Sequence, residues 1–166
     1  GRAVYQTYRQ FQEKGRVQLL TINSELQRFI DAQDGRIVGV NTYNDAVNEL
    51  SAGRKQTHWM WYVFPQLRGL GTSERAMYYG INGLREAREY LDDDVLRARL
   101  EKAVKIILNI ESVDAVAVFG HVDAEKLQAC LTLFAQLANQ QTLYQQALKK
   151  YFDNELHQPI LKLLNQ

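Results

Sequence analysis

Only two prolines, Pro65 and Pro159, interrupt the 166 residues of this chain. Strong helix formers dominate between them, which favours helices over a sheet built from many turns. Apolar residues recur at helical spacing along most of the chain, as Leu96, Leu100 and Ile107 do. The sequence therefore predicts an all-α fold: a single compact helical domain of about seven or eight helices.

Side chains that favour helix N-termini mark where several of these helices begin. Ser24 is a predicted N-cap, and Thr72 or Ser73 is predicted to cap one long helix that runs to Leu91. Cys130 lies in an apolar helical stripe, so we expect it to be buried as a small apolar side chain. Further helix starts are predicted at residues 92–94, at Asp123 and near Pro159.

Charge and cysteine content limit the class of protein. The chain has 20 Lys and Arg against 19 Asp and Glu, a formal net charge of +1. This balance does not point to nucleic acid or an anionic membrane as the main partner. The single cysteine cannot form an internal disulfide, and the first residues show no long apolar run with a basic flank and a small-residue cleavage site. Because no stretch approaches the roughly 18 apolar residues of a membrane span, we expect a soluble, cytoplasmic protein.

The segment between Gly53 and Gly71 breaks the helical pattern. Its aromatic residues, which include both tryptophans of the chain, follow neither a period of two nor one of 3.6. We predict an irregular aromatic loop here. Aromatic faces can stack on a purine or nicotinamide ring, and the helix start that follows offers free N–H groups to a phosphate. The segment is therefore the main candidate for a nucleotide site.

Two interpretations of this loop stay open. In the first its side chains bind a ligand, whereas in the second its tryptophans and phenylalanine only anchor the core. Ser73 and Glu74 likewise have an ordinary alternative role as a helix cap and a charge that matches the helix dipole. The candidate ligand-binding residues are His58, Trp59, Trp61, Phe64, Gln66, Ser73 and, on the helix after Asp123, Lys126.

Several common kinds of site are not indicated. The three histidines, His58, His121 and His157, are scattered, so no metal site is expected. The glycines match neither a phosphate loop nor a dinucleotide fingerprint, and no nucleophile elbow occurs. We therefore expect no resident cofactor.

Short stretches in a fixed order carry a resemblance to a known family. His58-Trp59-Met60-Trp61, Phe64-Pro65-Gln66 and Gly69-Leu70-Gly71 are among them, and Tyr151-Phe152-Asp153 extends the match near the C-terminus. On these motifs the chain closely resembles the domain of unknown function 1810 family. The resemblance implies a helical domain over residues 24–166, preceded by an N-terminal extension over residues 1–23.

That family is in turn distantly similar to the NAD and ADP-ribose associated (NADAR) superfamily, whose members act on ADP-ribose derivatives. This resemblance implies binding, and in an enzyme hydrolysis, of an NAD-derived or ADP-ribose-containing ligand. A Glu at a helix start followed by Met belongs to the NADAR site, and Ser73-Glu74-Arg75-Ala76-Met77 can be laid on that pattern. Glu74 is thus the candidate catalytic residue of an ADP-ribose-processing glycosyl hydrolase, although Arg75 stands where NADAR proteins have a histidine.

An alternative from another class is a non-catalytic helical protein-interaction module, whose aromatic loop is core and whose exposed helix faces meet a partner. A third alternative, single-stranded nucleic acid stacked on Trp59 and Trp61, needs a basic groove that the balanced charge does not promise. The sequence leaves the oligomeric state open.

Overall fold

The computed structural model describes residues 25–137 and 142–166. Within them the chain forms ten helices and no strand, with a single isolated parallel bridge between Leu67 and Ile81. The expected compact all-α fold is confirmed, with more helices than predicted. The N-terminal extension and the Ser24 cap lie outside the described residues. None of the described helices is long and apolar enough to cross a membrane.

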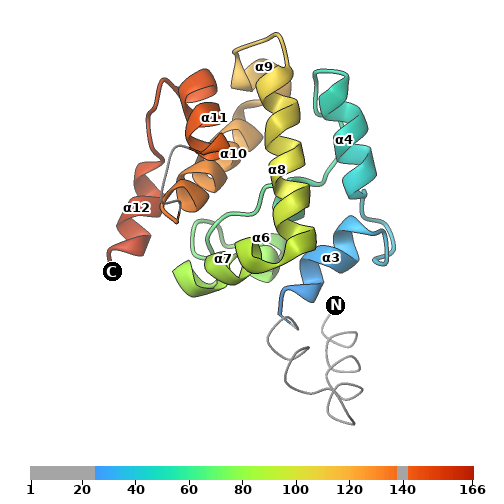
Figure 1. The fold of residues 1–166 in the computed structure, drawn as a ribbon. Helices are drawn as coiled ribbons and strands as arrows, with labels where there is room; N and C mark the ends of the chain where they lie inside the picture. The colour runs from blue at the N-terminus through green and yellow to red at the C-terminus, as the bar shows by residue number, and fades with distance from the viewer. Residues whose placement is uncertain (1–24, 138–141) are drawn as a thin grey trace.

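The helices pack around a central one, α8, as Figure 1 shows. α4 packs along one side of α8 and α11 along another, α7 lies at its N-terminal end, and α10 packs on α11 and α9. The helices are α3 (Gln27–Gln33), α4 (Tyr43–Ser51), α5 (Met60–Val63), α6 (Glu74–Tyr79), α7 (Gly83–Asp92), α8 (Asp94–Asn109), α9 (Ala115–Phe119), α10 (His121–Ala135), α11 (Leu143–Phe152) and α12 (Gln158–Leu164).

Helix α8 forms as its sequence predicts. The Asp93 carboxylate accepts hydrogen bonds from the backbone N–H groups of Val95 and Leu96, which satisfies donors that the first turn leaves free. Its predicted inner face is buried in the core, where it meets α4 and α11. The buried residues are Leu96, Leu100, Ala103, Val104 and Ile107.

The single long helix predicted from Thr72 or Ser73 to Leu91 is wrong, because the chain leaves the helical conformation at Gly80 and begins α7 at Gly83. In the interruption Ile81 N–H donates to the Gln66 carbonyl at 2.9 Å, and Arg68 N–H donates to the Ile81 carbonyl at 2.8 Å. A Cβ at Gly80 would lie 2.6 Å from Arg68 Cα, so only glycine allows this approach. The bridge fixes the backbone of the loop that carries Gln66.

Two further helices were not expected. Residues 60–63, inside the loop predicted to be irregular, form the single turn of α5. Residues 115–119 form α9, whose start is capped by the Asp114 carboxylate. Both are too short for a helical period to show in the sequence. Together with the break at Gly80, they explain why the structure has more helices than predicted.

The start of α10 also differs from the prediction. Asp123 was expected to cap this helix, but the helix begins at His121, and Gly120 occupies the N-cap position with φ of 81°. Asp123 lies within the first turn, where its carboxylate contacts Lys55 and Lys126. The predicted role of Pro159 is confirmed, since it lies in the first turn of α12.

Candidate functional site

The first tryptophan of the aromatic loop belongs to the core. Trp59 is fully buried, and its ring lies 6.2 Å from that of Phe64, which is also buried. Its indole N–H donates to a Glu49 carboxylate oxygen at 3.0 Å. The structure therefore buries Trp59 and Phe64, as the core interpretation expects.

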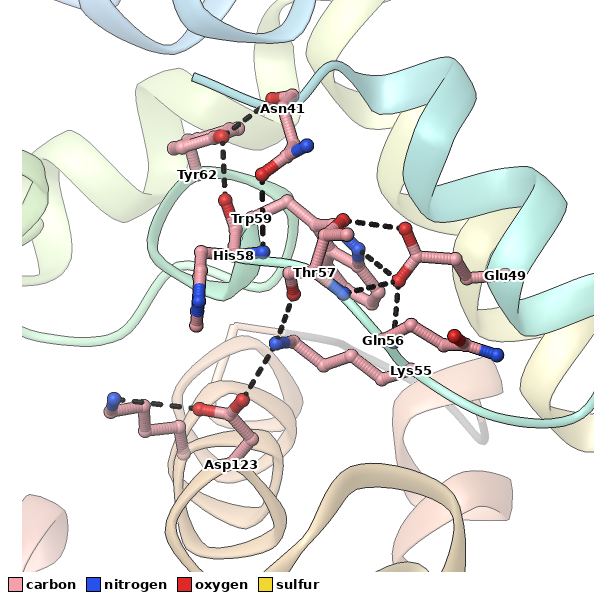
Figure 2. A network of polar contacts seen from close by, with 10 residues as sticks. Asn41, Glu49, Lys55, Gln56, Thr57, His58, Trp59, Tyr62 and Asp123 are labelled. Atoms are coloured by element: carbon pink, nitrogen blue, oxygen red, sulfur yellow. Dashed lines mark hydrogen bonds and ion pairs between the residues drawn. The ribbon is translucent and has the colours of Figure 1, made fainter. Parts of the chain in front are cut away.

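Glu49, on α4, organises the segment before α5 (Figure 2). Its carboxylate accepts hydrogen bonds from the backbone N–H of Gln56 at 2.6 Å, from the backbone N–H and hydroxyl of Thr57, and from Trp59. Burial raises the pKa of Glu49, but these hydrogen bonds outweigh it and hold the pKa below the ordinary value. Sequence reasoning missed this residue, because nothing near Glu49 in the chain signals a partner.

Lys55 connects this segment to α10. Its ammonium lies 2.8 Å from the Asp123 carboxylate, donates to the Thr57 carbonyl and sits 5.0 Å from the centroid of the Trp59 ring (Figure 2). Its backbone N–H donates to the Val118 carbonyl at 2.8 Å. Only 7 % of the Lys55 side chain is exposed, so this ion pair is held away from most solvent. Glu49, Lys55 and Trp59 are called the buried tryptophan network below.

Asp123 also contacts a second lysine. Lys126, one turn further along α10, lies 3.4 Å from Asp123 and 3.8 Å from the centroid of the Trp61 ring. Asp123 therefore joins two lysines, each of which covers one of the two tryptophans. Because one carboxylate pairs with two ammonium groups, Lys55, Lys126 and Asp123 together have a net positive charge.

Beside Lys126 the surface opens into a cleft of about 210 Å³, called the Trp61 cleft below. Segments far apart in the sequence meet there: the end of the aromatic loop, the first turns of α10 and the start of α12. Three candidate ligand-binding residues, Trp61, Gln66 and Lys126, line it. Other lining residues include Gly71, Glu125 and His157.

His157 is a cleft residue that sequence reasoning missed. Its ring is 6 % exposed, and Nδ1 accepts a hydrogen bond from the Ile160 backbone N–H at 3.3 Å, which caps α12. Its backbone N–H donates to the Thr132 hydroxyl at 2.9 Å. Its Nε2 lies 3.5 Å from a Glu125 carboxylate oxygen. No motif signals this position, since His157 reaches the cleft only after α12 folds back beside α10.

The remaining candidates lie elsewhere than on the lining of the Trp61 cleft. His58 is exposed, and its backbone N–H donates to Asn41 at 3.2 Å (Figure 2). Ser73 caps α6 by accepting from the Ala76 backbone N–H at 3.1 Å. Glu74 is exposed in the first turn of that helix. The structure thus brings together three of the seven candidate ligand-binding residues.

A second cleft, of about 580 Å³, lies where α4 and α8 end. It is lined by residues such as Gly53, Asn109 and Glu111, and by none of the candidates. Among residues 25–137 and 142–166, no group of three or more His, Cys, Asp or Glu side chains could hold a metal ion.

The described residues form a helical domain with a partly aromatic cleft, and comparison with known proteins gives its family. The chain belongs to the family described as protein of unknown function (DUF1810), whose model matches residues 23–164. The family resemblance expected from the sequence is therefore confirmed, whereas the similarity to the NADAR superfamily stays a prediction.

The crystal structure of the conserved hypothetical protein Rv1873 from Mycobacterium tuberculosis is similar to this chain. The two are 38 % identical, with a TM-score of 0.79 over 86 % of this chain and 97 % of the other. No curated protein matches the chain. The relatives thus establish the fold and the family and leave the activity to be argued from the site.

Proposed function

We propose that this protein binds an NAD-derived or ADP-ribose-containing ligand in the Trp61 cleft. The observation that carries the proposal is that Trp61 and Gln66, from the aromatic loop, line the same open cleft as Lys126, from the distant helix α10. An aromatic face suits a ring, an amide suits sugar hydroxyls, and an ammonium suits a phosphate. The cleft therefore offers one group for each part of such a ligand.

The size of the cleft limits how much of the ligand it encloses. Its volume of about 210 Å³ is below the roughly 300–1,000 Å³ of ordinary ligand pockets. One part of an ADP-ribose-sized molecule would be held inside, and the rest would lie across the surface. The Lys126 ammonium lies over one face of the Trp61 ring. Pairing with a ligand anion would draw this ammonium off the ring and free the face for stacking.

Hydrolysis is the proposed reaction if the bound ligand is turned over, with Glu74 as the carboxylate. Glu74 does not line the cleft itself, but Gly71, three residues before it in the chain, does. Cleavage of a ribosyl bond develops positive charge on the sugar, and one carboxylate can stabilise this charge or activate a water molecule.

A specific observation favours the alternative, a non-catalytic protein-interaction module. Apolar side chains are exposed around α9 and the start of α10: Val113 at 66 %, Val116 at 38 % and Val122 at 67 %. Exposed apolar side chains of this kind can contribute to a contact with a partner protein. This function would not depend on Glu74, although one of these side chains, Val122, also lines the Trp61 cleft.

Tryptophan fluorescence tests the binding proposal directly, because the two tryptophans differ in exposure. Titration with ADP-ribose and with NAD should give a saturable change in emission, since the ligand displaces Lys126 from the Trp61 ring. Trp61→Phe should abolish this change, while the buried Trp59 keeps reporting an intact fold. A thermal-shift measurement should agree, with a stabilisation of about 2.7 kcal/mol at 100 times the dissociation constant. Unchanged fluorescence and thermal stability at millimolar ligand would refute the proposal.

The catalytic part has its own test. Glu74→Gln should abolish release of nicotinamide from NAD, or of the base from an ADP-ribosylated base, and should leave ligand affinity almost unchanged. Glu111→Gln, at another exposed carboxylate, is the matched control and should keep full turnover. Normal turnover in Glu74→Gln would remove Glu74 from the mechanism. If the wild-type protein binds the ligand but does not turn it over, the protein is a ligand-binding domain and not a hydrolase.

A further inference from the structure

We propose that the Trp61 cleft holds a phosphate group between the Lys126 ammonium and the Nε2–H of His157, here called the phosphate seat. This inference rests on the proposed function in that it names the part of the ligand that the cleft encloses. It assigns a binding role to His157, whose position at the cleft depends on the packing of α12 beside α10.

The hydrogen bonds of His157 determine which ring nitrogen can serve a ligand. Nδ1 accepts from the Ile160 backbone N–H, so it presents a lone pair, and the ring proton of the neutral histidine must be on Nε2. The backbone of His157 is held by the Thr132 hydroxyl, which is itself fully buried. Nε2–H is therefore a hydrogen-bond donor with a fixed direction in the wall of the cleft.

This donor has no close partner among the described residues. The nearest acceptor that the structure shows is a Glu125 oxygen at 3.5 Å, longer than the 2.7–3.2 Å of an ordinary N–H···O bond. The Glu125 side chain is 70 % exposed, so it can turn into solvent at little cost. A phosphate oxygen could take its place at hydrogen-bonding distance from Nε2.

Lys126 supplies the charge. Its ammonium has three donors, but its contact with Asp123 is 3.4 Å long, and Asp123 lies closer to Lys55, at 2.8 Å. Lys126 is therefore only partly neutralised, and its other contact is the face of the Trp61 ring. A charge-assisted hydrogen bond to a phosphate would be stronger than the contacts that the Lys126 ammonium makes with the Trp61 ring and with the shared Asp123 carboxylate.

The charged groups around the phosphate seat predict that replacing Lys126 and replacing Glu125 change the affinity for phosphate in opposite directions. Lys126 attracts an anion and Glu125 repels it, while Lys55 and Asp123 form their own pair behind Lys126. Replacing the lysine should weaken phosphate binding, and replacing the glutamate should strengthen it. A role of these residues in folding alone would not produce this reversal.

The test measures ribose 5-phosphate and ribose binding by calorimetry in three variants. Lys126→Met should weaken ribose 5-phosphate binding about tenfold or more, the usual effect of losing a charged hydrogen bond. His157→Asn keeps a side-chain oxygen to cap α12 but withdraws the ring donor, and should weaken binding several-fold. Glu125→Gln should tighten it about threefold, more at low salt. Ribose should bind weakly and equally to all.

The outcomes separate this inference from the proposed function. If Lys126→Met and His157→Asn bind ribose 5-phosphate like the wild type, or if the wild type does not bind it, the phosphate seat is wrong. Binding of ADP-ribose that persists in both variants would then leave the proposed function standing. If ribose 5-phosphate binds in a Lys126-dependent way while ADP-ribose does not bind, the seat stands and the proposed function fails.

Discussion

The two tryptophans of the aromatic loop lie two residues apart and have opposite surroundings. Trp59 is fully buried, and Glu49 on α4 accepts a hydrogen bond from its indole N–H. Trp61 is half-exposed and forms a wall of an open cleft. Each ring has a lysine ammonium over it, and both lysines share Asp123. The buried tryptophan network therefore connects α4, the aromatic loop and α10, whereas the Trp61 cleft is the proposed ligand site.

The difference comes from one helical turn. Trp59 is the N-cap of α5 and Trp61 is its second residue. Two positions along a helix are about 200° apart around its axis, so one ring points into the core when the other points out. Aromatic density marks this loop as unusual, but the orientation of α5 decides which ring is available for binding.

The largest expected effect comes from removing the buried ring. Trp59→Ala should cost about 3–5 kcal/mol of unfolding free energy, because it leaves a cavity and frees Glu49 of a donor. Trp61→Ala should cost less than half of that, since its ring already meets solvent. Urea unfolding followed by circular dichroism measures both. Equal decreases in unfolding free energy would mean that the two rings contribute equally to stability despite their different burial.

Glu49→Gln should be the next largest change. It replaces charge-assisted hydrogen bonds to Gln56, Thr57 and Trp59 by neutral ones, at a cost of about 1–3 kcal/mol at neutral pH. Because the pKa of Glu49 is lowered in the folded protein, its contribution is present above the ordinary value of 4.5 and is lost as pH falls through the folded-state pKa. The difference in unfolding free energy between the wild type and Glu49→Gln should therefore become smaller as the pH falls.

The control for this variant is Glu111→Gln, at an exposed carboxylate outside the buried tryptophan network. Unfolding free energies are measured at pH 7 and at pH values below 4.5. The difference from the wild type should depend on pH for Glu49→Gln and not for Glu111→Gln. A difference that stays constant across this range would mean that the charge of Glu49 does not stabilise the loop.

The sequence predicts most of the helical scaffold because long amphipathic helices carry their own signal. The inner face and the Asp93 cap of α8 follow from spacing and side-chain chemistry within the helix. The break at Gly80 does not, since it depends on a backbone pairing with the distant loop at Gln66 and Arg68. Tertiary contacts of this kind override a local apolar period.

The candidate site could be predicted only in part, because only some of its residues have a local signal in the sequence. Trp61 and Gln66 could be found because they belong to a locally unusual segment. Glu49 and His157 could not, because each is an ordinary residue on a helix or helix cap until folding brings it to the loop or the cleft. Partners that lie far away in sequence leave no local pattern.

On the cleft side, His157 offers a smaller test of stability. His157→Ala removes the cap of α12 and should cost about 1 kcal/mol, whereas His157→Asn should cost only a few tenths, because asparagine is a good N-cap. Thermal unfolding of the two variants measures the difference. A loss in His157→Asn as large as in His157→Ala would mean that the ring itself, rather than its capping nitrogen, holds α12 in place.

The smallest effect on stability is expected at Lys126. Lys126→Met should change the unfolding free energy by less than about 1 kcal/mol, because its contact with Asp123 is long and its cation–π contact is partly exposed. Lys55→Met should cost more, since Lys55 is nearly buried, lies 2.8 Å from Asp123 and also binds the Thr57 carbonyl. Urea unfolding of both variants decides the order. Asp123 still pairs with Lys55 when Lys126 is replaced. A larger decrease in unfolding free energy for Lys126→Met than for Lys55→Met would therefore show that Lys126 is needed to hold the loop on α10 and is not free to bind a ligand.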